Sequence, residues 1–396
     1  MSARAPLYWM ALGAFAVGTE SFMIAAILPE IALDLSVSTQ VAGQLVSVFA
    51  LTYAASSPLL TVLTGAVNRR MLLIGSMTFF VLANVVAAVA ESYAGLVVAR
   101  VFLAMAAGLY VPNATAVAGS LVPPNQRGWA LSVVTSGLSL AIVFGVPLGA
   151  LVGQGFGWRM TFVAVAGLAI LAVVGLVAGL PKAVGAGIPV VSLQQRLDVL
   201  RFPAVWRPLA VTTLWATGPF MLYPYLASYV PVVSGLEGAW VGAVLFAWGG
   251  AAFLGLAIGG RATDKLGAGR VVNMTLPMLA FGLFGLSFTA NLMPMSFALV
   301  PMLIGIAIWG FAAWAFYPAQ QARLIAIAGV QNAPVILSLN ASFHYFGFSL
   351  GAALGAVVLG MDGVRNLGFA GAAFVIAACI LNLRPSRVPT ACANAA

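Results

Sequence analysis

Apolar stretches, each long enough to cross a lipid bilayer and almost free of charge, follow one another along the whole chain. A membrane-spanning helix needs about 20 predominantly apolar residues, and we count twelve stretches of that kind. The first six cover about 7–29, 41–64, 71–90, 94–119, 129–152 and 160–180, and the second six cover about 207–230, 240–259, 271–290, 296–318, 333–359 and 366–383. This pattern predicts an all-α membrane protein with twelve transmembrane helices.

The composition supports this prediction and excludes several kinds of chemistry. Charged residues make up 6% of the chain, whereas a soluble domain carries about 25%. Neither Lys182 nor Lys265 lies in a G-x-x-x-x-G-K-[ST] loop, so the chain has no ATP-hydrolysing site of that type. One histidine and two cysteines cannot build a His/Cys metal site. We therefore expect no metal and no cofactor.

One long connection, about 181–206, divides the twelve stretches into two sets of six. We predict an N-terminal six-helix bundle over 1–180, a cytoplasmic linker over 181–206, and a C-terminal bundle with a short cytoplasmic tail over 207–396. Within the linker, Leu193, Leu197 and Leu200 would share one face of a short helix on the membrane surface. A solvated linker with incidental leucines is an equal alternative.

The basic residues lie mostly on one side of the predicted membrane. Fourteen of the 17 Lys and Arg residues fall on the side that holds both termini, which by the positive-inside rule is the cytoplasm. The net charge of +9 is therefore a topology signal and does not indicate a nucleic-acid partner.

Two loops repeat each other across the halves. Asn68-Arg69 follows the second stretch, and Asp264-Lys265 follows the eighth at an offset of 196 residues. A duplicated six-helix unit is the architecture of many secondary transporters.

These loops and several further motifs resemble the major facilitator superfamily. Gly260-x-x-x-Asp264-Lys265-x-Gly267 matches its G-x-x-x-D-[RK]-x-G loop signature, whereas the first copy has Asn68 in place of the acid. Arg100, with a glycine eight residues later, is similar to the arginine motif of proton-coupled members. Gly145-Val146-Pro147-Leu148-Gly149 resembles the G-P-x-x-G antiporter signature with Val146 inserted.

Three shorter motifs narrow the resemblance. Ile27–Ala32, Gly157–Arg159 and Leu339–Ser342 resemble the twelve-helix drug:proton antiporter family, and the bacterial sugar and purine-nucleoside efflux permeases are the most similar group. The resemblance implies two pseudo-symmetric bundles in a bacterial inner membrane, with a small-molecule substrate, protons and the lipid bilayer as partners. We expect a monomer.

Glu20 is the acid most suited to proton coupling, because it is the only one within a predicted span and lies near the bilayer midplane. A carboxylate at that depth costs about 2.5–3.5 kcal/mol on insertion scales. His344 also lies near the midplane, and histidine titrates close to neutral pH. Arg100 stays charged, and it could change the proton affinity of Glu20 or bind an anionic or carbonyl group of the substrate. For each of the three, a purely structural hydrogen-bonded role is the alternative.

The resemblance implies that spans one, four, seven and ten line a central cavity. The tenth carries Gly310, Trp314, Tyr317 and Gln321 on one helical face, and the other expected lining residues are Asn113, Trp215 and Tyr223. Aromatic rings with a few amides suit a planar or amphipathic ligand. Helix packing or a membrane-interface belt is the alternative role for each residue.

Two motifs are expected to act in conformational change. Gly260 has no Cβ atom, so it would allow the end of the eighth span to approach a neighbouring helix closely. Asp264, beside Lys265, would then face the positive end of that helix when the cytoplasmic side is closed. The alternative is that the charges of this loop serve only to fix the topology of the chain in the membrane. Gly145, Pro147 and Gly149 would permit bending and tight packing of the fifth span.

The sequence therefore predicts a secondary active transporter that exports a small organic molecule in exchange for protons by alternating access. A facilitator or proton symporter for sugar or nucleoside uptake is the alternative. A membrane-embedded enzyme or sensor is a more remote one, because the chain has no clustered nucleophile, base and metal ligands.

Overall fold

The computed structural model describes residues 5–65, 67–123, 126–181, 184, 203–329 and 332–383, and these are almost entirely helical. The first half contains α1 (Ala5–Asp34), α2 (Thr39–Leu63), α3 (Arg69–Ala88), α4 (Tyr93–Ser120), α5 (Arg127–Leu140), the π-helical turn η2 (Ala141–Gly145), α6 (Val146–Phe156) and α7 (Trp158–Gly179). The second half contains α9 (Pro203–Leu222), the 3₁₀ turn η3 (Tyr223–Tyr225), α10 (Leu226–Ser234), α11 (Ala239–Leu266), α12 (Ala268–Leu292), α13 (Met295–Ala328), α14 (Ala333–Asp362), η5 (Val364–Asn366) and α15 (Leu367–Leu383).

Eleven of the predicted spans are continuous segments, long and apolar enough to cross a membrane, within the described part of the chain. The predicted seventh span is present but broken into α9, η3 and α10. Pro219 and Pro224 lie at this break, and proline removes a backbone hydrogen bond wherever it enters a helix. Arg207 also lowers the hydropathy of α9. The all-α prediction is confirmed, with the seventh helix interrupted.

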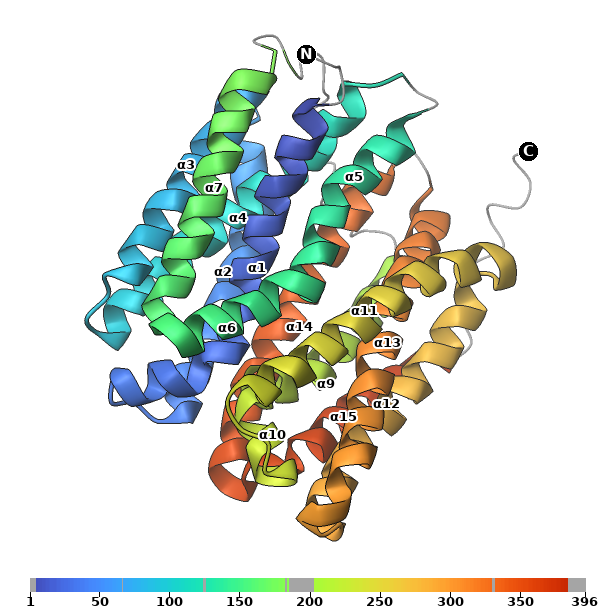
Figure 1. The fold of residues 1–396 in the computed structure, drawn as a ribbon. Coiled ribbons are helices and arrows are strands. Elements are labelled where there is room, and N and C mark those ends of the chain that lie inside the picture. Colours follow the sequence, from blue (N-terminus) through green and yellow to red (C-terminus); the bar gives the residue numbers. More distant parts are fainter. Residues whose placement is uncertain are drawn as a thin grey trace, which may run out of the picture.

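The two halves use equivalent helix pairings. In the first half, α3 packs on α4 and α7, and in the second half α12 packs on α13 and α15, which are the spans six places later. In the same way, α1 packs on α5 and α9 packs on α14. Figure 1 shows the blue-to-green helices on one side and the yellow-to-red helices on the other, with α14 running beside α2.

The domain boundaries remain a prediction. The linker segment 185–202, with the helix expected at Leu193–Leu200, and the tail 384–396 lie outside the described residues.

The residue inserted in the antiporter-like motif coincides with a helical irregularity. The backbone N–H of Val146 donates to the carbonyl of Ala141, five residues earlier, and this closes the π-helical turn η2. A single extra residue in an α-helix is accommodated by such a turn. Pro147, which follows directly, has no N–H to donate, so the ladder is already weakened there. The fifth span is therefore irregular at the motif.

This π-helical turn also lies at the boundary between the halves. It packs on α1 on one side and on α11 on the other. A Cβ atom on Gly249 of α11 would lie 2.5 Å from the carbonyl oxygen of Ile142. The backbones of the two halves therefore approach each other as closely as glycine allows.

Arginines tie the helix ends of the first half together. Arg69 is buried and donates to Asn113 Oδ1 over 3.1 Å, which joins α3 to α4. Arg70 donates to the carbonyls of Val177 and Leu180 at the end of α7, over 2.7 and 3.0 Å. Asn68 caps α3 by accepting from the N–H groups of Arg70 and Met71. The first copy of the loop motif therefore has a packing role within its own half.

We predict that Gly249→Ala lowers the thermal stability of the purified protein, because its methyl group meets the Ile142 carbonyl. Overpacking of this kind costs about 1–3 kcal/mol. Gly250→Ala is the matched control, since a Cβ atom on Gly250 has nothing within 4 Å. Equal melting midpoints for the two variants in detergent would contradict the close approach.

Candidate functional site

An ion pair lies inside the first half, at the middle of α1. The Nη1 of Arg100 donates to Oε1 of Glu20, and both side chains are completely buried. Arg100 also donates from Nε to the carbonyl of Leu45 over 3.2 Å, and its guanidinium lies 4.2 Å from the centre of the Phe49 ring. The site therefore joins α1, α2 and α4. Glu20 and Arg100, which the sequence analysis proposed as proton-coupling residues, are 80 positions apart in the chain and in direct contact here.

The pair has unused hydrogen-bonding capacity. Glu20 Oε2 and Arg100 Nη2 are buried and have no hydrogen-bond partner among the described residues. Buried polar atoms are normally satisfied, so such an exception requires an explanation. Within the described residues, Glu20 is also the only fully buried carboxylate. A buried ion pair adds little net stability compared with apolar packing of the same volume.

An aromatic cluster occupies the facing half. The ring of His344 lies 5.1 Å from Trp215, 5.2 Å from Tyr317 and 4.1 Å from Phe348, measured between centroids. These residues come from α9, α13 and α14. The Nε2 of His344 and the Nε1 of Trp215 are buried without a hydrogen-bond partner in the described structure. His344 forms neither a hydrogen bond nor an ion pair with Glu20 or Arg100, so the three candidate proton-coupling residues fall into two separate groups.

Aromatic side chains connect the two groups across the boundary between the halves. Phe22, two residues after Glu20, lies edge-on to Tyr223 and Trp314 at 6.0 and 6.1 Å. The hydroxyl of Tyr223 donates to the Phe22 carbonyl over 2.9 Å.

A second contact across the boundary pairs two tyrosines. Tyr53 of α2 stacks on Tyr345 of α14 with 3.8 Å between ring centroids. The sequence interpretation missed Phe22, Tyr53 and Tyr345. Tyr53 and Tyr345 lie on spans two and eleven, which were not expected to line the cavity, although aromatic residues at mid-span were a usable signal.

Two of the expected cavity residues have packing roles. Asn113 is buried and bonded to Arg69, and Gly310 lies against the backbone of α11, where a Cβ atom would be 2.7 Å from the Trp248 carbonyl oxygen. The sequence placed both in the cavity because the resemblance implies that spans four and ten line it, and a cavity role for either residue stays a prediction. Trp314, Tyr317 and Gln321 do share one face of α13, and Gln321 bonds to Tyr317.

The residues expected to act in conformational change differ in their surroundings: those of the Asp264 loop are exposed or uncrowded, and the glycines of the fifth span are packed. Asp264 and Lys265 are exposed, and a Cβ atom on Gly260 would have nothing within 4 Å. Asp264 forms no ion pair with any described residue. The glycines of the fifth span are packed instead: Gly145 lies against Thr19, and Gly149 lies against Met23.

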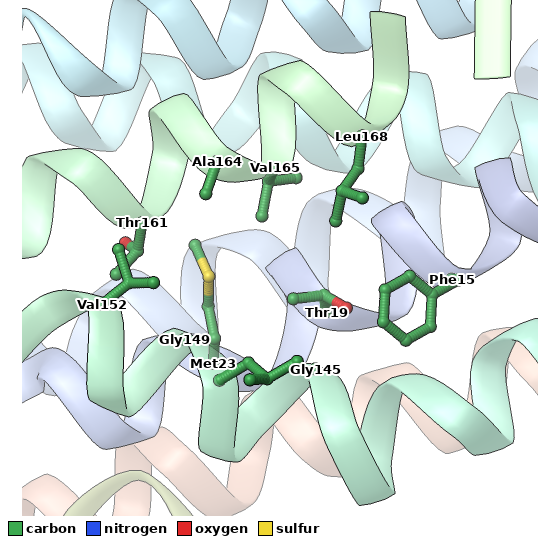
Figure 2. A pocket seen from close by; sticks show the side chains of 11 residues that line it. Phe15, Thr19, Met23, Gly145, Gly149, Val152, Thr161, Ala164, Val165 and Leu168 are labelled. Atoms are coloured by element: carbon green, nitrogen blue, oxygen red, sulfur yellow. The ribbon is translucent and has the colours of Figure 1, made fainter. Parts of the chain in front are cut away.

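A small apolar pocket opens beside these glycines, between α1, α6 and α7. Its volume is about 60 Å³, and Figure 2 shows Thr19 and Met23 lying between the fifth span and α7. The lining residues are Phe15, Thr19, Met23, Gly145, Leu148, Gly149, Val152, Thr161, Ala164, Val165 and Leu168. The pocket contains neither Glu20 nor any member of the aromatic cluster, so it is distinct from the site described above.

Two pseudo-symmetric helical bundles, with a buried ion pair inside the first and an aromatic cluster inside the second, are the architecture of a multi-pass membrane transporter. The family model of the Major Facilitator Superfamily matches residues 10–352, so this chain belongs to that superfamily. It is a transporter family and not an enzyme family.

Known proteins agree with this assignment. An uncharacterized MFS-type transporter, YbcL of Bacillus subtilis, is 33% identical over 97% of this chain and 96% of its own length. A chloramphenicol resistance protein of Streptomyces lividans is 34% identical over 72% of this chain and 73% of its own. A solved bacterial homolog of the human lysosomal transporter Spinster, in an inward-facing and occupied conformation, has the same fold, with a TM-score of 0.75 and 17% identity over 95% of both chains.

We predict that Glu20→Leu is strongly destabilising, because it leaves the charge of Arg100 buried without a partner. Breaking one side of a buried pair costs about 3–5 kcal/mol. The double variant Glu20→Leu with Arg100→Leu should recover most of that loss, as measured by thermal unfolding in detergent. Additive losses in the double variant would show that the two side chains do not depend on each other.

Proposed function

We propose that the protein exports a small organic molecule in exchange for protons, in a bacterial inner membrane, with Glu20 as the proton carrier. The observation that supports this most strongly is the buried Glu20–Arg100 ion pair. Ionisable residues inside a membrane are expensive and usually mark ion or substrate pathways. The carboxylate of Glu20 can be neutralised by a proton, whereas the guanidinium of Arg100 does not lose its charge in proteins.

Protonation of Glu20 would be transmitted to the boundary between the halves through α1. Neutralising Glu20 removes its attraction to Arg100, which stays bound to α2 through the Leu45 carbonyl and the Phe49 ring. Phe22 follows Glu20 on the same helix and contacts Tyr223 and Trp314 of the other half. A change at the ion pair therefore reaches the cross-boundary contacts within two residues of α1.

We propose that the present arrangement is inward-facing, with both termini in the cytoplasm. Two of the contacts between the halves lie near the end at which α1 meets α2. There the ring of Tyr225 lies against Gly43, and the hydroxyl of Ser349 donates to the Ser47 carbonyl over 2.9 Å. The exposed position of Asp264 at the opposite end fits a latch that is released in this state.

The aromatic cluster supports a planar or amphipathic substrate. Trp215 and His344 combine aromatic rings with ring nitrogens that have no hydrogen-bond partner among the described residues, and ligand sites join apolar contact with a few placed polar groups. The relative described as a chloramphenicol resistance protein makes an aromatic drug of that kind a suitable first probe.

The test is efflux from proteoliposomes of a nucleoside, a pentose, chloramphenicol and a lipophilic cation, with and without an inward proton gradient. Antiport predicts export that rises with the gradient and is accompanied by proton movement. Transport that does not respond to the gradient would favour a facilitator and reject Glu20 as the proton carrier.

We predict that Glu20→Gln abolishes gradient-driven export while the protein still folds, because the amide oxygen can still accept from Arg100 but cannot carry a proton. Glu30→Gln is the matched control, since Glu30 lies on the same helix and is only partly buried. The measurement is initial export rate across a pH series. An unchanged pH dependence in Glu20→Gln would exclude this residue as the carrier.

We predict that Asp264→Asn shifts the population toward the inward-facing state, because a neutral amide gains less from a helix dipole than a carboxylate. The readout is the ratio of labelling at single cysteines placed on the two membrane sides. Glu237→Gln, an exposed acid in the loop between α10 and α11, is the control. A ratio that is the same in Asp264→Asn and in the parent protein would reject the latch.

A further inference from the structure

Two arginines of the second half converge on one asparagine at the ends of four helices. Arg207 of α9 donates to the backbone carbonyls of Leu381 and Asn382, and Arg323 of α13 donates to Asn382 Oδ1. Asn382 of α15 in turn donates to Asn273 Oδ1 of α12 over 2.6 Å. We call these residues, Arg207, Arg323, Asn273 and Asn382, the arginine–asparagine cluster.

The cluster keeps unused donors and an unbalanced positive charge. Arg323 uses only Nη1, and Arg207 uses only Nε and Nη2, in hydrogen bonds to described residues. Both side chains are half-buried, and the two cations are close enough to repel each other electrostatically. No carboxylate of the described residues forms an ion pair with either arginine. Three guanidinium nitrogens of the cluster therefore have no hydrogen-bond acceptor among the described residues, and an anion bound there would be stabilised by both charges.

The first half provides a contrast. There Arg69 and Arg70 bond to separate partners, the Asn113 side chain and the end of α7. Two arginines do not share one acceptor residue in that loop. In the second half, by contrast, both arginines donate to Asn382, so the two guanidinium groups lie side by side.

The position of the cluster favours an anion that belongs to the membrane. It lies where membrane-spanning helices begin or end, on the side predicted to be cytoplasmic. Trp206, next to Arg207, is 47% exposed and packs edge-on against Phe343. Tryptophan is enriched at membrane–water interfaces, and basic pockets between helices on this side bind anionic lipid headgroups.

We propose that the arginine–asparagine cluster binds the phosphate of an anionic phospholipid headgroup. The unused guanidinium donors of Arg207 and Arg323 would hold the phosphate oxygens as a bidentate fork. A bound lipid would then link α9, α12, α13 and α15 at the membrane surface. This inference does not depend on proton coupling or on the transported substrate.

The test uses the purified full-length protein and native mass spectrometry to count bound phosphatidylglycerol and phosphatidylcholine with the same acyl chains. We expect the parent protein to retain phosphatidylglycerol preferentially. Arg207→Gln and Arg323→Gln should each reduce that preference about fivefold, the ratio that corresponds to about 1 kcal/mol per basic residue at a membrane surface. Arg261→Gln, an exposed arginine of the same half, is the control and should leave the preference unchanged.

Two outcomes would overturn the proposal. The first is an equal lipid preference in the parent protein and both variants. The second is that inorganic phosphate alone raises the melting midpoint as much as phosphatidylglycerol does, which would assign the cluster to free phosphate. If Arg207→Gln does not fold, the lipid preference of Arg323→Gln, which loses a single hydrogen bond, decides the test. A second measurement is then the lipid preference of the parent protein at high salt, which should be lost because salt screens the charges.

Discussion

The buried ion pair between Glu20 and Arg100 joins α1 to α2 and α4 inside the first half. It places opposite charges in the middle of a membrane-spanning bundle, where each charge without the other would be costly. Because Arg100 is also bound to the backbone and an aromatic ring of α2, the pair fixes α1 against two neighbours. A single proton can neutralise only the side of the pair that α1 contributes. A chemical event at one carboxylate can therefore change how one helix is held.

The contacts between the halves are of a kind that can slide. They consist of aromatic edges and stacks, a few hydrogen bonds from side chains to backbone carbonyls, and glycines in close contact with the other half. Gly249 lies against the Ile142 backbone, and Gly43 lies against the Tyr225 ring. Contacts of this kind include few directional bonds that would have to break when the two bundles rock. The strong polar ties, such as Arg69 with Asn113 and Arg323 with Asn382, lie within a half and hold it as a unit.

The fold could be predicted from the sequence because hydropathy and the distribution of basic residues act over whole segments. The breaks also had local signals: prolines at 219 and 224 in the seventh span, and the inserted Val146 in the fifth. The candidate site could be predicted only in part. Glu20 and Arg100 stood out because a charge inside a membrane is rare, and the structure brings these two side chains together. The contacts of Asn113 and Gly310 with neighbouring helices could not be predicted, because a helical face does not identify its neighbour and an amide or a glycine serves packing as readily as binding. The contacts of Phe22, Tyr53 and Tyr345 across the boundary depend on how the two bundles pack together. A local sequence pattern does not predict that packing.

In the proposed mechanism, the proton on Glu20 sets the balance between the two openings. Spin labels on the two halves, one pair at each membrane face, would report this balance as distances recorded across a pH series. We expect the distance distributions of the parent protein to shift with pH in opposite directions at the two faces. We expect Glu20→Gln to keep one distribution at every pH. Distributions that shift equally with pH in both proteins would exclude Glu20 as the residue that sets the balance.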